Sequence, residues 1–342
     1  MASGADSRED GCVSRDPSPT DPQAFARSLV HEIQETAEKL LRDGADLGEL
    51  KLANTALKEM RQSFRVFGRY RDIRKVATFG SARTQPDWPA WSQAHAFAER
   101  LANRGFMIIT GAGPGIMHAS QQGSGRDLSF GVNIRLPFEQ DANEVIQEDE
   151  KLIHFKYFFT RKLTFVKESD AIALFPGGFG THDEGFEALT LLQTGKADPA
   201  PVVFLDAPGG NYWKTWRDYV ERHLLDEQLI SEQDMHLFRV TDDVDEAVAE
   251  ITGFFHRYHS QRYVGDRLVL RMQSPVSEPV LRELNRDFAD ILREDAGPIV
   301  QQGALAEEAD EPDLLELPRL VLPFTRMDFG KLRMLIDRIN AS

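Results

Sequence analysis

Short apolar runs alternate with longer amphipathic stretches through the middle of the chain. The runs lie at residues 76–79, 106–109, 130–134, 171–175 and 202–205. Continuous runs of this length are typical of strands that are buried on both faces. The amphipathic stretches predict helices at residues 91–104, 117–125, 157–169, 183–195 and 213–225. This alternation predicts an α/β, Rossmann-like fold over residues 71–255, with a parallel sheet flanked by helices.

The two ends of the chain have different patterns. Residues 1–22 are rich in Ser, Asp, Pro and Gly and predict a disordered tail. Apolar residues at helical spacing over residues 23–70 predict an extension of about two helices. Residues 256–342 predict a small α+β appendage, with a ferredoxin-like arrangement as one hypothesis. Strands are expected at 267–272, 299–305 and 319–324, helices at 278–292 and 329–339, and a solvated acidic loop at 307–316.

Composition narrows the class of protein. Of 342 residues, 41% are hydrophobic and 28% are charged, which is ordinary for a globular protein. A formal net charge of -15 would repel a nucleic-acid backbone, so we expect no nucleic-acid partner. The single cysteine, Cys12, excludes a disulfide scaffold. Because the chain shows neither a secretory signal nor a membrane-spanning apolar run, we expect a cytoplasmic protein with no membrane partner.

Glycine-rich segments follow three of the predicted strands. They read Gly80-Ser81-Ala82-Arg83, Gly111-Ala112-Gly113-Pro114-Gly115-Ile116-Met117 and Pro176-Gly177-Gly178-Phe179-Gly180-Thr181. Because ligands bind at the carboxyl ends of parallel strands, where bare backbone amides can approach an anion, these segments together indicate a nucleotide phosphate site. Each segment alone is equally compatible with glycine serving turn geometry. The dinucleotide fingerprint is broken, since Ile116 stands where its third glycine belongs.

Acidic and basic residues lie close to the last of these segments. Thr181 and Glu184 have the spacing of a helix capping box, which would give Glu184 a purely structural role. A helix N-terminus would also keep Glu184 ionised, so that it could act as a base or stabilise a cation, and the two roles are compatible. Arg161 and Lys162 lie on the preceding predicted helix, either on a solvated face or at the site.

These residues resemble the LOG ("Lonely guy") family of nucleoside 5′-monophosphate phosphoribohydrolases, which were long described as lysine decarboxylases. The stretch from Pro176 to Glu184 is similar to the family signature Pro-Gly-Gly-x-Gly-Thr-x-x-Glu. Arg161-Lys162 resembles the family's Arg-Lys pair, with Arg161 23 positions before Glu184. The sequence departs from the family pattern at His182 and Gly185, where we expect apolar residues. These two differences concern which base the protein prefers. The added end segments resemble the longer, bacterial-type members.

The resemblance implies hydrolysis of the N-glycosidic bond of a nucleotide, such as AMP or a cytokinin riboside monophosphate, by a homodimer without cofactor or metal. It implies catalytic roles for Arg161 and Glu184, with Asp183 and Glu187 as weaker candidates for the acidic role. Phosphate binding is implied for Gly177, Gly178, Gly180 and Thr181. Further nucleotide contacts are expected from Gly80, Ser81, Gly111, Gly113, Gly115, Met117 and Lys162, with Arg83 as a helper.

Three alternatives remain open at this point. A nucleotide sensor could use the same fold and the same residues without catalysis. A pyridoxal-dependent decarboxylase would need a Schiff-base lysine, for which Lys162 is the candidate. An NAD-dependent oxidoreductase is disfavoured by the broken glycine fingerprint.

Overall fold

A parallel seven-stranded sheet forms the centre of the computed structural model, which describes residues 22–135 and 141–342. Its order is β4-β3-β2-β1-β5-β6-β7, and each neighbouring pair is parallel. Ala77 on the central strand β1 lies opposite Ile109 on β2 and Ile172 on β5. The strands are β1 (Lys75–Phe79), β2 (Met107–Thr110), β3 (Ser129–Ile134), β4 (Leu152–Phe155), β5 (Ala171–Leu174), β6 (Val202–Leu205) and β7 (Phe238–Thr241).

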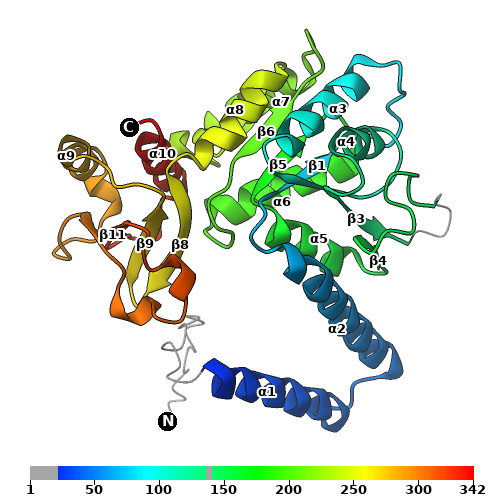
Figure 1. Cartoon of the computed structure of the whole chain (residues 1–342), viewed down its shortest axis with the longest axis horizontal. Coiled ribbons are helices and arrows are strands. Elements are labelled where there is room, and N and C mark those ends of the chain that lie inside the picture. Colours follow the sequence, from blue (N-terminus) through cyan, green and yellow to red (C-terminus); the bar gives the residue numbers. More distant parts are fainter. Residues whose placement is uncertain (1–21, 136–140) are drawn as a thin grey trace, which may run out of the picture.

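Helices cover both faces of this sheet (Figure 1), as the alternating pattern predicts. One face packs against α2 (Leu47–Phe67), α5 (Phe158–Glu168), α6 (Phe179–Gln193) and α7 (Tyr212–Val220). The other packs against α3 (Pro89–Ala102), α4 (Ile116–Ser124) and α8 (Val244–Phe254). Every residue of β2, β3, β5 and β6 is buried, which explains their continuous apolar runs. The predicted Rossmann-like α/β fold is therefore confirmed.

The two edge strands, β4 and β7, escaped prediction from the sequence. Each has only one neighbouring strand and is only partly buried, so it contains polar residues such as His154 and Arg239 among the apolar ones. A short mixed run of this kind carries no clear strand signal.

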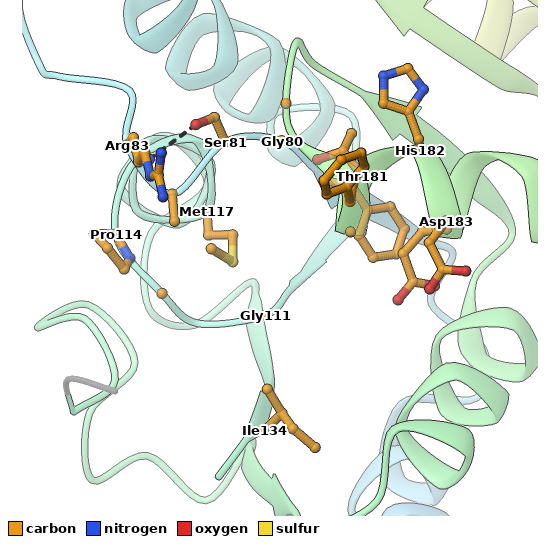
Figure 2. A pocket seen from close by; sticks show the side chains of 18 of the residues that line it. Gly80, Ser81, Arg83, Gly111, Pro114, Met117, Ile134, Thr181, His182 and Asp183 are labelled. Carbon is orange, nitrogen blue, oxygen red and sulfur yellow. Dashed lines mark hydrogen bonds between the residues drawn. The ribbon is translucent and has the colours of Figure 1, made fainter. Parts of the chain in front are cut away.

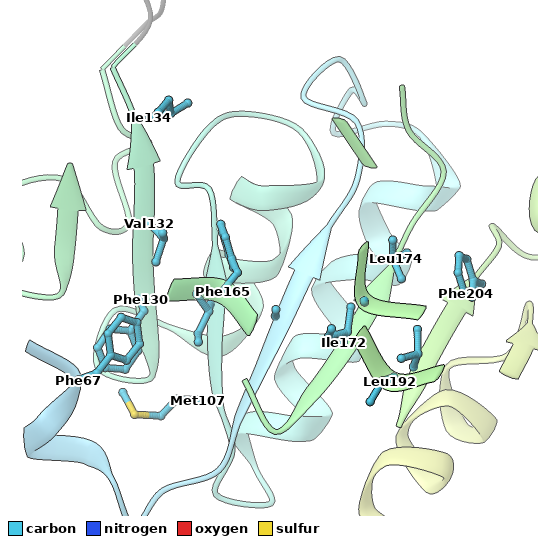
Figure 3. Packing of buried hydrophobic residues seen from close by; sticks show 14 of the residues in the cluster. Phe67, Met107, Phe130, Val132, Ile134, Phe165, Ile172, Leu174, Leu192 and Phe204 are labelled. Atoms are coloured by element: carbon cyan, nitrogen blue, oxygen red, sulfur yellow. The ribbon is translucent and has the colours of Figure 1, made fainter. Parts of the chain in front are cut away.

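Two helices precede the sheet, as predicted. α1 (Pro22–Arg42) lies apart from both sheets (Figure 1), whereas α2 packs against the seven-stranded sheet. Phe67 stacks on Phe130 with 4.3 Å between ring centroids, and Figure 3 shows the two rings side by side. Buried Glu59 accepts hydrogen bonds from the Lys156 amide and the Thr160 hydroxyl, both at 2.6 Å, which ties α2 to the start of α5. Residues 1–21 of the predicted tail, including Cys12, lie outside the described residues.

A second, antiparallel sheet of four strands follows, in the order β10-β11-β9-β8. Its elements are β8 (Tyr258–Val264), β9 (Arg267–Met272), α9 (Glu278–Asp287), β10 (Val300–Gln302), β11 (Arg319–Leu322) and α10 (Phe329–Asn340). The predicted α+β character is confirmed. The ferredoxin-like hypothesis is wrong, because two hairpins, each followed by a helix, replace the βαββαβ order of that fold. β8 was missed because five of its seven residues are only half-buried.

The acidic stretch at residues 307–316 is exposed over most of its length, as its composition predicts, but it is anchored to the sheet by buried ion pairs. Glu308 is fully buried and pairs with two buried arginines, Arg271 on β9 and Arg319 on β11. Glu311 pairs with Arg271 and with Arg262 on β8. The arginines projecting from the sheet thus bind this segment across its face, an attraction that the composition of the segment alone does not reveal.

No helix within residues 22–135 and 141–342 combines the length and apolarity needed to cross a bilayer.

We expect the Glu308→Gln substitution to lower the free energy of unfolding by about 3 kcal/mol, because it removes the paired carboxylate of buried Arg319 and one of the two carboxylates paired with buried Arg271. Chemical denaturation followed by circular dichroism measures this change. Glu316→Gln is the matched control, since Glu316 is exposed on the same segment, and should change stability by less than about 0.5 kcal/mol. Equal denaturation midpoints for the two variants would contradict the role of the buried ion pairs.

Candidate active site

A large cavity opens where the sheet order changes direction. The chain proceeds outward from β1 through β2 on one side and from β5 through β6 on the other, which leaves a crevice beyond the carboxyl ends of β1 and β5. The cavity there has a volume of about 1010 Å³. Figure 2 shows Ser81, Gly111, Met117 and Thr181 on different sides of this space.

Most of the residues predicted for the site line this cavity. They are Gly80, Ser81, Arg83, Gly111, Gly113, Met117, Arg161, Gly177, Gly178, Gly180, Thr181, Asp183 and Glu184. Three predicted residues, Gly115, Lys162 and Glu187, are not among the lining residues and have other contacts. The structure therefore brings three separate glycine segments and both proposed catalytic side chains to one place.

Backbone hydrogen bonds hold the strand-end loops together. The Ser81 amide donates to the Pro176 carbonyl at 3.1 Å, and the Ile116 amide donates to the Ser81 carbonyl at 3.1 Å. Gly115 permits this close approach, because its φ is +66° and a Cβ on it would lie 2.3 Å from the Ser81 carbonyl oxygen. Gly115 thus shapes the cavity without lining it.

The third glycine segment forms the N-terminus of α6. The helix begins at Phe179, earlier than the predicted Asp183, and Gly178 is its N-cap. Thr181 therefore lies inside the first turn, so the capping-box interpretation of Thr181 and Glu184 is wrong. The first amides of a helix have no acceptor within it, and nothing lies within 4 Å of a Cβ built on Gly178 or Gly180. This end of the cavity is accessible to an anion.

Arg161 reaches the cavity from α5. Its Nε donates to the Val132 carbonyl at 2.8 Å, and its guanidinium carbon lies 5.2 Å from the centre of the Phe165 ring. A Cβ on Gly111 would lie 2.5 Å from Arg161 Nη2. The bare backbone at Gly111 therefore leaves the space that the guanidinium occupies.

Glu184 faces the same cavity from the second turn of α6 and is only 9% exposed. Burial raises the pKa of its carboxyl to about 7, against the opposing charges of Lys162 and Arg161. The sequence predicted that the helix dipole would keep this group ionised. Burial outweighs that effect, so at neutral pH the carboxyl exists in comparable amounts with and without its proton.

Lys162 joins the helices that carry Arg161 and Glu184. Its ammonium lies 2.9 Å from a carboxylate oxygen of Asp183 and 2.9 Å from one of Glu187. Although burial opposes the effect, hydrogen bonds to these carboxylates raise the pKa of Lys162. Lys162 and Glu187 thus form an ion-pair bridge between α5 and α6.

Several lining residues escaped the sequence analysis, chiefly Asn133, Phe158 and Tyr212. The Asn133 side chain donates to the Gly111 carbonyl at 3.3 Å. The Tyr212 hydroxyl donates to the Gly177 carbonyl and lies 2.7 Å from His182 Nε2. The signal that could have found Asn133 and Tyr212 is their position at or after the ends of β3 and β6, at the sheet edge where the glycine segments lie.

Across residues 22–135 and 141–342, no three His, Cys, Asp or Glu side chains lie together as a possible metal site.

Residues 112–251 match the protein-family model described as "Possible lysine decarboxylase". The match covers 140 of the 342 residues, and over that stretch it agrees with the resemblance to the LOG family seen in the sequence. It spans Arg161 and the whole signature from Pro176 to Glu184. No curated protein matches the chain.

Three solved structures with detectable similarity each align with about half of the chain. One is the X-ray structure of TM1055, with 22% identity over 53% of this chain and 99% of that chain, at a TM-score of 0.38. Another is the molybdenum cofactor carrier protein of Chlamydomonas reinhardtii, with 19% identity, coverages of 53% and 96%, and a TM-score of 0.38. A third is the single-stranded-DNA-binding DNA processing protein A of Helicobacter pylori, with 16% identity, coverages of 53% and 81%, and a TM-score of 0.37.

We expect opposite effects on stability from two alanine substitutions in the glycine segments. Gly115→Ala should lower the free energy of unfolding by about 3 kcal/mol, because positive φ and the Ser81 carbonyl leave no room for a methyl group. Gly180→Ala should keep stability or raise it by up to about 1 kcal/mol, because alanine favours a helix and the space there is open. Thermal unfolding measures both, and equal transition temperatures would contradict the role assigned to Gly115.

Proposed function

We propose that this protein hydrolyses the N-glycosidic bond of a nucleoside 5′-monophosphate, of the AMP or cytokinin riboside monophosphate type, to free base and ribose 5-phosphate. The observation that carries the proposal is that buried Glu184 and the Arg161 guanidinium line one cavity with an open helix N-terminus. The family match over residues 112–251 fits an enzyme of this superfamily.

The reaction breaks the bond between C1′ of the ribose and a nitrogen of the base. The base leaves with the bonding electron pair and takes a proton, while a water oxygen forms a new bond to C1′. Positive charge develops on C1′ and O4′ as the base departs, as in glycoside hydrolysis. We assign Glu184 to this centre, where its carboxylate stabilises the cation and accepts a proton from the attacking water.

The 5′-phosphate of the nucleotide lies away from the bond that breaks, and the protein can bind the substrate through it. We assign this phosphate to the amides from Gly177 to Gly180 and to the side chain of Thr181, whose own amide donates to the Gly178 carbonyl, with Arg161 supplying a positive charge. Binding energy from this non-reacting group can place the ribose against Glu184, which lies further along the same helix. One helix therefore carries both the anchor and the base.

The older family description suggests lysine decarboxylation, which requires pyridoxal phosphate on a lysine. The residues of the cavity do not fit pyridoxal phosphate. No lysine is among the described residues that line the cavity, and the Lys162 amine is held as a cation between Asp183 and Glu187. Such an amine is a poor nucleophile. The homodimer and the assignment to the longer, bacterial-type members stay predictions of the family resemblance.

We expect Glu184→Gln to reduce turnover of AMP by about 1000-fold while AMP affinity changes by less than about threefold, since the amide keeps the shape but cannot accept the proton. Chromatographic detection of free adenine measures turnover, and calorimetry measures binding. Exposed Glu227→Gln serves as the control. A variant as active as the wild type would remove Glu184 from the mechanism, and a wild-type protein that binds AMP without releasing adenine would indicate a nucleotide sensor.

We also expect a pH dependence of turnover. Because the base form of Glu184 is required and its pKa is about 7, kcat should fall by about tenfold for each pH unit below that value. The affinity for ribose 5-phosphate, measured over the same range, separates this effect from ionisation of the phosphate, whose second pKa is about 6. A kcat that is constant between about pH 5 and pH 7 would contradict a base with this pKa.

A further inference from the structure

We propose that Tyr212 and His182 are positioning residues that aim the phosphate-binding amides through the carbonyl of Gly177. The inference rests on the proposed function only for the identity of the ligand, a phosphate monoester. Neither residue needs to touch the reacting atoms. Their contribution is to hold one peptide unit of the loop between Pro176 and Gly178 in a single orientation.

The hydrogen bonds in this group have a defined direction. The Gly177 carbonyl can only accept, so the single Tyr212 hydroxyl proton is donated to it. The Tyr212 oxygen must then accept from His182, whose Nε2 lies 2.7 Å away and must carry a proton. Proton donation thus runs from His182 to Tyr212 to Gly177. Burial lowers the pKa of His182, and the neutral imidazole can still donate through Nε2.

Because a trans peptide is planar, the hydrogen bond that fixes the Gly177 carbonyl also fixes the direction of the Gly178 amide. The carbonyl of Gly177 and the amide of Gly178 belong to one planar unit and point in opposite directions. The carbonyl points toward Tyr212, at the start of α7, which follows β6. The Gly178 amide therefore points away from Tyr212. In the sheet order, β6 and β1 lie on opposite sides of β5.

The carbonyl of Pro176 is held from the β1 side. Pro176 accepts from the Ser81 amide, and a Cβ on Gly177 would lie 3.0 Å from the Ser81 nitrogen and 2.1 Å from Thr181 Oγ1. The segment is thus confined between the β1 loop and α6. Tyr212 supplies the remaining support, from the β6 side.

Tyr212 is itself held in place by the first turn of α7. The Asp206 carboxylate, just after β6, accepts from the Trp213 amide at 2.9 Å and from the Lys214 amide at 3.4 Å. The Trp213 ring is fully buried and lies 5.3 Å from the His182 ring and 4.8 Å from the Tyr212 ring. Figure 2 shows His182 on the far side of Thr181 from Gly111 and Met117. The pair therefore supports the loop from the β6 side, at the border of the cavity.

The test compares Tyr212→Phe with Tyr219→Phe, which removes the same hydroxyl from an exposed tyrosine further along α7. Calorimetry with ribose 5-phosphate measures phosphate binding, and AMP hydrolysis gives kcat and KM separately. We expect Tyr212→Phe to weaken ribose 5-phosphate binding by about fivefold to tenfold and to raise KM by a similar factor, with kcat within about twofold. Tyr219→Phe should match the wild type in all three quantities.

His182 is tested by two further variants. His182→Leu should weaken ribose 5-phosphate binding, and His182→Gln, whose side-chain amide can donate in place of Nε2, should restore most of it. Thermal unfolding of each variant confirms that the fold is kept. The inference is overturned if Tyr212→Phe or His182→Leu binds ribose 5-phosphate as tightly as the wild type, or if the wild type does not bind it. A wild type that binds ribose 5-phosphate but releases no base from AMP would instead overturn the proposed hydrolysis.

Discussion

The candidate site depends on a set of backbone hydrogen bonds between strand-end loops that are far apart in sequence. The amide of Ile116 binds the carbonyl of Ser81, the amide of Ser81 binds the carbonyl of Pro176, and the hydroxyl of Tyr212 binds the carbonyl of Gly177. These bonds join the loops after β2, β1, β5 and β6 in the order of their strands. Because a peptide fixed at its carbonyl has its amide directed the other way, holding the carbonyls also sets where the amides point.

Burial and the neighbouring positive charges shift the pKa of Glu184, the acidic residue at the centre of this site, in opposite directions. Burial alone would keep Glu184 neutral, and the cations of Arg161 and Lys162 favour its ionised form. The Lys162 bridge to Asp183 and Glu187 fixes one of these cations at the join between α5 and α6. The resulting pKa, near neutrality, is the range in which a carboxylate works well as a general base.

The antiparallel sheet is connected to α6 at the end away from the cavity. Gly195, just beyond α6, has positive φ, and a Cβ on it would lie 2.0 Å from the ring of Phe329, the first residue of α10. α10 in turn packs on the antiparallel sheet through Leu332, Leu335 and Ile336. The helix that has the glycine segment from Pro176 to Thr181 at its start is thus packed at its end against the C-terminal part of the chain.

The sequence by itself determined the central strands, because a strand buried on both faces must be apolar throughout, and it determined the glycine segments, because close backbone approach requires glycine. It also singled out Arg161 and Glu184. It could not predict β4, β7 and β8, whose exposure permits polar residues, or the burial of Glu308, which depends on arginines of other strands. Only the tertiary structure decided that α6 begins at Phe179, that burial raises the pKa of Glu184, and that Tyr212 supports Gly177. The last two depend on groups distant in the chain, whose proximity is created by the sheet order and is not encoded in any local pattern.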